Sequence, residues 1–209
     1  MSCYYNDSLT TLNVSGCTSL EELFCGYNNL TTLNISSCTA LKSLHCTNNR
    51  LSILDVSGCT SLGYLHCENN SLTTLDVSKC ITLKELRCYN NSFNTNGYDS
   101  LMCSLPINNS GNIAYFVPLN NSSDATASAF MASNATNAKA KNWSVEYYKG
   151  GDIPATSGTY TCSGGGGTTP QVNMNRYITL NVKQGEQITI NLTTDSANIP
   201  VRVVSGDSI

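Results

Sequence analysis

The chain has 209 residues, 40% of them hydrophobic, which is enough to bury a globular core. Charged residues make up only 12%, against about 25% in an average soluble domain. The net charge is -3, which argues against nucleic-acid binding, because a basic stripe is needed to neutralise phosphates. No apolar run approaches the ~20 residues that span a bilayer and Met1 does not begin a signal peptide, so we expect no membrane insertion.

A period of 21 residues organises the first part of the chain. Each repeat reads Leu-x-x-Leu-x-Cys-x-x-Asn-x-Leu, and the last one ends on Phe93. One column of cysteines is Cys25, Cys46, Cys67 and Cys88, preceded by Cys3, and a second is Cys17, Cys38, Cys59 and Cys80. This is the leucine-rich-repeat consensus with Cys in place of the third leucine. We therefore predict an α/β fold in which residues 1–93 form a leucine-rich-repeat solenoid of 21-residue coils, each burying its apolar edge against its neighbours.

Each column of the repeat has an expected role. The Leu-x-x-Leu-x-Cys segment predicts a short strand on the concave side, and the following Asn is expected to hydrogen-bond the backbone of neighbouring coils. The other half, with Leu54, Val56 and Cys59 pointing inward, supplies the opposite wall, and strands on both sides remain an open alternative. A polar column of Asn13, Asn34, Asp55 and Asp76 has too few carboxylates for calcium, so we predict turn capping.

The repeats resemble those of bacterial surface proteins. The sequence of residues 72–80, Leu-Thr-Thr-Leu-Asp-Val-Ser-Lys-Cys, is similar to a Cys-containing kind of leucine-rich repeat from Bacteroidetes. The arrangement of the repeats is similar to that of internalins. The resemblance implies a secreted or surface-attached binding protein, hence an extracellular or cell-surface location. The sequence departs from that family by starting inside a repeat, and we expect a fragment. We expect a monomer.

The eleven cysteines predict buried thiols more than a disulfide framework. Nine of them stand in the two columns, and they form no Cys-x-x-Cys pair of the kind that clamps zinc. Neighbours within a column would lie about 4.8 Å apart with parallel Cβ vectors, which is poor disulfide geometry. Cys103 and Cys162 stand outside the columns, and a bond between them is left open.

After the repeats the period fails. We expect residues 94–149 to form an α/β cap, 150–170 a Gly-, Thr- and Ser-rich linker, and 171–209 a short β-rich tail or the start of a β-sandwich. The sequences of Ser104-Leu105-Pro106 and of Lys141 to Val145 resemble those in the C-terminal cap of the same bacterial proteins. The elements predicted are a turn at Asn96-Gly97, a helix over 98–105, a strand over 113–117, a helix over 124–140 begun by Ser123, a strand over 143–148, and tail strands over 178–182, 188–192 and 201–203.

The candidate ligand-binding residues are those that strand alternation directs outward, on the concave face. Large aromatic residues and Arg dominate binding hot spots, and none of these positions is needed for packing. The residues are Phe24, Tyr27, His45, Tyr64, His66, Glu68, Arg87 and Tyr89. They favour a non-enzymatic module that binds a protein or glycan; the alternative is a structural spacer or adhesin stalk.

Two histidines in successive coils invite a sharper interpretation. His45 and His66 would stand about 5 Å apart, close enough to share a metal or form half a catalytic pair. Their column continues as Phe24 and Arg87, however, which is typical of a varied surface. The sequence has no nucleophile elbow, phosphate loop or His-Glu-x-x-His motif, so we predict no catalytic, metal or cofactor site.

Overall fold

The computed structural model describes residues 1–162 of the chain, which belong to a unit spanning Met1–Gln171. The predicted tail strands and the expected 171–209 domain lie outside the described residues. The elements in chain order are β1 (Thr11–Asn13), β2 (Glu22–Phe24), β3 (Thr32–Asn34), β4 (Ser43–His45), β5 (Tyr64–His66), β6 (Glu85–Arg87), α1 (Thr95–Ser104), β7 (Ala114–Leu119), α2 (Ala127–Met131), α3 (Thr136–Lys139) and β8 (Trp143–Tyr147).

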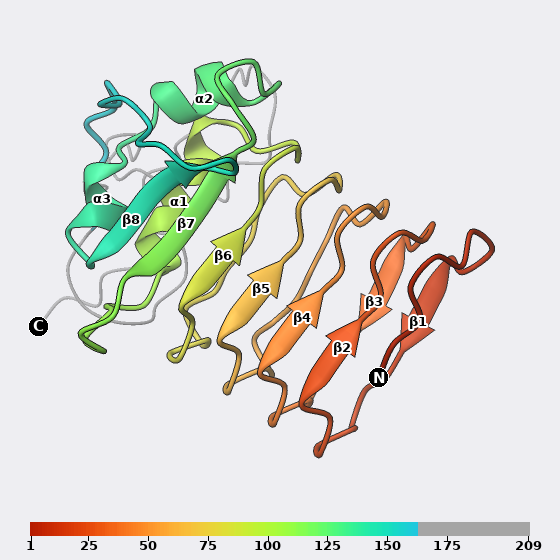
Figure 1. Cartoon of the computed structure of the whole chain (residues 1–209). Coiled ribbons are helices and arrows are strands. Elements are labelled where there is room, and N and C mark those ends of the chain that lie inside the picture. Colours follow the sequence, from red (N-terminus) through yellow and green to blue (C-terminus); the bar gives the residue numbers. More distant parts are fainter. Residues whose placement is uncertain (163–209) are drawn as a thin grey trace, which may run out of the picture. The chain divides into compact units, whose positions relative to one another are not determined.

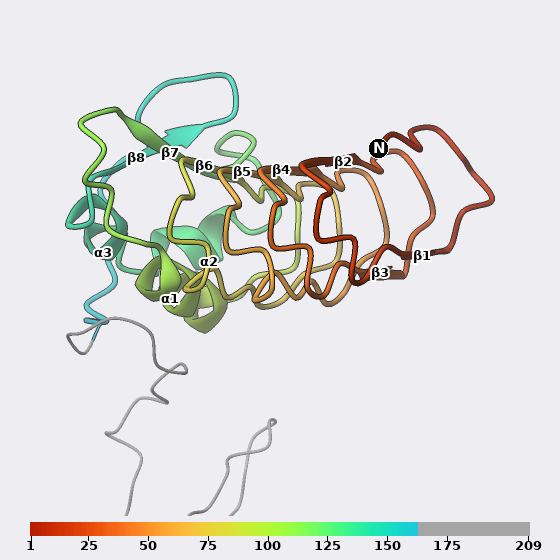
Figure 2. The ribbon, with the colours of Figure 1, turned by 90° about the horizontal axis from the view of Figure 1, so that it is seen from below.

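Six strands form one parallel sheet in the order β2-β4-β5-β6-β7-β8 (Figure 1). In β2, β4, β5 and β6 the paired residues are 21 positions apart, as the sequence period predicts. The central leucine of each strand is fully buried: Leu23, Leu44, Leu65 and Leu86. Mostly parallel strands with few helices fit an α/β fold of the leucine-rich-repeat kind. Helices α1 and α2 lie on the side of the sheet opposite its exposed face (Figure 2).

The opposite half of the repeats also contains strands, the alternative that the sequence left open. β1 pairs with β3 in parallel, and both lie across the core from β2 (Figure 2). The polar column there caps turns as predicted: Asp55 Oδ1 accepts from Ser57 N at 2.9 Å. Hydrogen bonds from the Ser57 side chain and then from its backbone N–H lower the pKa of Asp55, because they stabilise the carboxylate.

A column of asparagines binds each repeat to the one before it. Asn49 Nδ2 donates to the carbonyl oxygens of Cys25 and Cys46 at 3.0 Å and to that of Thr47 at 3.3 Å, and its Oδ1 accepts from Leu30 N at 2.9 Å. Asn28, Asn70 and Asn91 repeat this arrangement. Backbone groups at the bend, which could not be left unpaired inside the fold, are thereby satisfied.

The cysteine columns are free thiols inside the core, as the sequence predicts. Seven are fully buried: Cys25, Cys38, Cys46, Cys59, Cys67, Cys80 and Cys88. Cys3 is half-buried and Cys17 exposed, since the first described repeat has a neighbour on one side only. The thiol of Cys38 donates to the carbonyl oxygen of Val14 in the preceding repeat at 3.2 Å. Burial raises the pKa of Cys67 well above its usual value, so its thiolate is disfavoured.

The cap keeps the predicted elements but shifts two of them. Helix α1 begins at Thr95, three residues before the predicted 98–105, and Asn96-Gly97 is helical instead of a turn. Asn94 Oδ1 caps the helix by accepting from Gly97 N at 2.8 Å. A Cβ on Gly97 would stand 2.6 Å from Thr73 O, so the glycine serves close packing. The strands predicted at 113–117 and 143–148 are β7 and β8.

The single helix predicted at 124–140 is wrong; two short helices, α2 and α3, stand in its place. Asn134 N donates to Asp99 Oδ1 at 2.8 Å, and Asn134 Oδ1 accepts from Thr136 N at 3.2 Å. These tertiary and turn bonds draw the backbone out of the helix despite its alanine-rich composition.

Residues 150–162, which the sequence assigned to a linker, are tied to the cap. We call them the strap. Ser157 N donates to Met131 O at 2.8 Å, Ala135 N donates to Thr156 Oγ1 at 2.9 Å, and Cys162 forms a disulfide with Cys103. The described part of the expected linker is therefore a packed segment of the cap.

Candidate functional site

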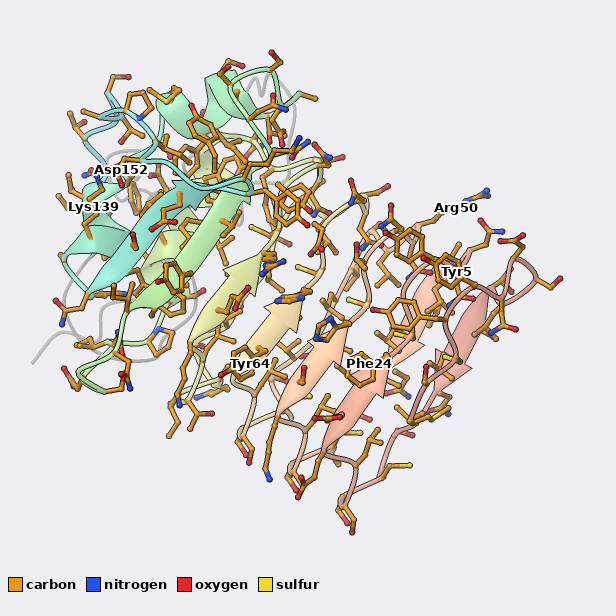
Figure 3. All side chains as sticks on the ribbon, in the orientation of Figure 1. Tyr5, Phe24, Arg50, Tyr64, Lys139 and Asp152 are labelled. Atoms are coloured by element: carbon orange, nitrogen blue, oxygen red, sulfur yellow. A yellow bond between two sulfur atoms is a disulfide. The ribbon has the colours of Figure 1, made fainter. Side chains whose placement is uncertain are left out.

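The face of the sheet turned toward the viewer in Figure 3 carries a row of interacting side chains, and Phe24 and Tyr64 project from it. The strand register sets Phe24 beside His45, His45 beside His66, and His66 beside Arg87. The residue before each of them in its own strand, Leu23 or its equivalent, points into the core, because successive residues of a strand face opposite sides. We call the row from Phe24 to Arg87 the central row.

Ring contacts link the first three members of the central row. The Phe24 and His45 ring centroids are 4.8 Å apart, and those of His45 and His66 are 4.2 Å apart in an edge-on arrangement. The two Nδ1 atoms are 3.2 Å apart, so one donates to the other. The histidines that the sequence placed in one column are therefore in direct hydrogen-bond contact.

The partners at both ends of the histidine pair fix its tautomers. His66 Nε2 lies 3.2 Å from Glu85 Oε1, and an ionised carboxylate only accepts, so His66 carries its proton on Nε2 and accepts at Nδ1. His45 must then donate from Nδ1, which leaves its Nε2 to accept from Ser43 Oγ at 3.0 Å. A directed chain of hydrogen bonds thus runs from Ser43 through both imidazoles to Glu85.

The histidine pair is held in its neutral form. Burial lowers the pKa of His66 to about 4, with further lowering from His45 and Arg87, while Glu85 acts in the opposite direction. Burial, then Arg87, lowers the pKa of His45. The proton that charges His66 would go to Nδ1 and would remove the acceptor of the bond between the rings. The proton that charges His45 would go to Nε2 and would remove the acceptor for Ser43 Oγ. The series of hydrogen bonds from Ser43 to Glu85 is therefore intact at neutral pH and is disfavoured in acid.

The C-terminal end of the central row is charged and aromatic. Arg87 Nε pairs with Glu85 Oε1, and the Arg87 guanidinium carbon lies 5.4 Å from the centre of the Tyr148 ring. The Tyr148 ring in turn lies 4.8 Å from that of Tyr89. The sequence analysis missed Tyr148, since it follows β8, where the 21-residue period no longer applies.

Two of the predicted contact residues are buried. The exposed fraction of Tyr89 is 6%, and Tyr148 packs against it. The exposed fraction of Glu68 is 7%, and its Oε2 has no hydrogen-bond partner among residues 1–162. Burial raises the pKa of the Glu68 carboxyl. Alternation places both side chains outward, but neighbouring side chains on the face cover them, which a pattern within one strand does not reveal.

Of the other six predicted residues, four are half-buried and two are exposed; the half-buried ones are Phe24, His45, His66 and Arg87. Tyr64 and Tyr27 are each 43% exposed, Tyr64 at the start of β5 and Tyr27 just beyond β2. Tyr27 contacts two tyrosines that the sequence analysis missed, Tyr4 and Tyr5. The 22-residue offset between Cys3 and Cys25 was the available signal, because it aligns Tyr5 with Tyr27.

The surface offers neutral imidazoles, an ion pair and aromatic rings. Within residues 1–162, no three His, Cys, Asp or Glu side chains gather as a group that could hold a metal ion. Over the same residues, no helix has the length and apolar character needed to cross a membrane. The imidazoles, ion pair and aromatic rings of the face can make hydrogen bonds and ring contacts.

No family model and no curated protein matches the chain. Among solved structures, the chain is similar to the functional domain of InlJ from Listeria monocytogenes, which includes a cysteine ladder, at 43% identity and a TM-score of 0.39. The likeness covers 41% of this chain and 19% of that one, so this chain spans about a fifth of the other's length. The similarity is partial, and the proposals below rest on this chain's own side chains.

Proposed function

We propose that the chain is a non-enzymatic recognition module, a leucine-rich-repeat solenoid of 21-residue coils whose sheet face binds a protein or glycan. The observation that carries the proposal is the central row, a continuous series of contacts from Phe24 through the histidine pair and Glu85 to Arg87. A location outside the cell or on its surface, and a monomeric state, form part of the proposal.

The composition of the face favours recognition over the alternative of a spacer or stalk. A spacer needs only solvated positions that repeat from coil to coil, such as Ser and Thr. The combination of residues on the face instead differs from repeat to repeat, and it includes the exposed Tyr64 and the half-buried Arg87. Tyr and Arg are the residue types that contribute most to binding free energy at interfaces.

The test combines a glycan array and a pull-down with the intact chain, followed by affinity measurements with the ligand obtained. We expect Tyr64→Ala and Arg87→Ala each to weaken binding by about 5- to 30-fold, equivalent to about 1–2 kcal/mol, with little change in melting temperature. Tyr89 is left out of this test, because it is buried and its replacement would alter stability.

The matched control is Ile53→Ala, because Ile53 is 78% exposed and belongs to the opposite half of its repeat. Equal losses in the control and the two face variants would place binding elsewhere. A chain that retains no ligand in either assay would support the spacer.

A further inference from the structure

Three tyrosines form an exposed stack at the N-terminal end of the sheet face. The Tyr5 and Tyr27 rings are stacked with centroids 4.6 Å apart and an angle of 23° between their planes. The Tyr4 ring lies 6.1 Å from Tyr27 and 6.2 Å from Phe24, which connects the group to the central row. We call Tyr4, Tyr5 and Tyr27 the tyrosine stack; Tyr5 is labelled in Figure 3.

Two of these tyrosines occupy a backbone conformation that disfavours them. Tyr5 and Tyr27 have φ of 57° and 53°, in the left-handed region. The equivalent position in the next three repeats holds asparagine, at Asn48, Asn69 and Asn90, with φ between 50° and 55°. Asparagine tolerates this conformation, whereas it is unfavourable for a bulky residue.

Burial offsets this cost only in part, because both residues remain exposed. Tyr5 is 72% exposed and Tyr27 43% exposed. Asparagine would satisfy the turn with less strain, as it does three times in the same chain. Strained residues of this kind gather at binding sites, where the position of the side chain matters more than local stability.

Gly26 completes the arrangement. A Cβ at this position would lie 2.6 Å from Tyr4 Cε1 and 2.9 Å from the Thr47 methyl carbon. The absence of a side chain therefore lets the Tyr4 ring lie against the backbone between Phe24 and Tyr27. The stack thus depends on residue choices in two successive repeats.

The chemistry of the stack selects a class of ligand. The faces of aromatic rings are electron-rich, and they complement C–H bonds polarised by neighbouring oxygen atoms, as on the flat face of a sugar ring. Two amides close to the tyrosines in sequence, Asn6 and Asn29, donate from Nδ2 to backbone carbonyls, and their Oδ1 atoms can accept from hydroxyl groups. Asp7 is the one carboxylate within two residues of any of these tyrosines in sequence. Such a border suits an uncharged polyhydroxyl ligand, since a protein hot spot more often combines aromatic residues with a pocket for an apolar or charged anchor.

We propose that the tyrosine stack binds the sugar rings of a neutral glycan. The proposal rests on the proposed function and names the ligand class for one end of the face. Sugar rings lie on the exposed faces of Tyr5 and Tyr27, and the neighbouring amides bind the hydroxyl groups.

The experiment is isothermal titration calorimetry of the intact chain with three neutral hexasaccharides: cellohexaose, chitohexaose and maltohexaose. We expect at least one to bind, and Tyr27→Asn and Tyr5→Asn each to weaken that binding at least tenfold. Neither variant should lower the melting temperature, because asparagine suits the left-handed position. The control is Tyr115→Asn, since Tyr115 is 38% exposed on β7 and far from the stack in the strand order.

The possible outcomes separate this proposal from the more general one. No binding of any hexasaccharide, or unchanged binding in both stack variants, overturns the saccharide proposal. If Tyr64→Ala and Arg87→Ala then weaken the binding of a protein ligand, the proposed recognition function stands without the saccharide proposal. An equal loss in Tyr115→Asn would also overturn it, because the effect would not be specific to the stack.

Discussion

Replacing Asn49 by alanine is expected to be among the most damaging single changes in the repeats. The substitution removes three donated hydrogen bonds and one accepted from Leu30 N. Each bond contributes about 0.5–1.5 kcal/mol net, and leaving the buried Leu30 N–H unpaired adds about 1–3 kcal/mol. We expect a loss of about 3–5 kcal/mol, a large share of the roughly 5–15 kcal/mol by which domains are stable.

Urea denaturation followed by far-ultraviolet circular dichroism measures the loss, and fluorescence of the single tryptophan, Trp143, reports on the cap. Coincident transitions would show that repeats and cap unfold together. The control is Ser52→Ala, an exposed residue of the same repeat. A loss below about 1 kcal/mol for Asn49→Ala would refute the claim that the asparagine column holds the repeats together.

Two further predictions concern the histidine pair and the thiols. Because the pKa of His66 falls from 6.5 to about 4 on folding, the unfolded chain binds more protons between these values, and stability should fall as pH drops from about 6.5 to 4, by up to about 3 kcal/mol. The pKa of Glu68 is raised, which has the opposite effect on the pH dependence of stability. The measurement is therefore the difference in unfolding free energy between wild type and the double variant His45→Gln/His66→Gln as pH is lowered. Parallel pH profiles of the two proteins would contradict the prediction. Cys67→Ser should cost about 1–3 kcal/mol, since a hydroxyl is costlier to bury than a thiol, although the Arg87 carbonyl oxygen that the thiol reaches at 3.4 Å could accept from it. Thiol titration should find nine reactive groups in denaturant without reductant but few in the native chain. A serine variant as stable as wild type would show that this core position accepts a hydroxyl.

The sequence was informative where the fold repeats. A constant period identifies which leucines and cysteines share a column, so the strand register and the asparagine column could be predicted without coordinates. The same reasoning placed His45 and His66 side by side on one face. It could not supply the hydrogen bonds that order the pair, because these depend on the side-chain positions of Ser43, in the same strand as His45, and of Glu85, in the strand beside His66.

Prediction failed where contacts join distant, non-repeating segments. Tyr148 lies 59 positions after Tyr89, and no pattern within the repeats indicates that the two rings meet. The strap has the composition of a linker, yet its backbone bonds to Met131 and Ala135 hold it in place. That the face binds a ligand stays a prediction.

Each bond of the asparagine column lies within a repeat or joins it to its immediate neighbour, so an in-frame duplication of 21 codons would add a repeat without breaking that pattern. Each added strand would widen the sheet by about 4.8 Å. A duplication between β4 and β5 would move the tyrosine stack away from Arg87 while leaving both ends intact. The reach of the surface is thus adjustable in uniform steps, independently of the groups at its ends.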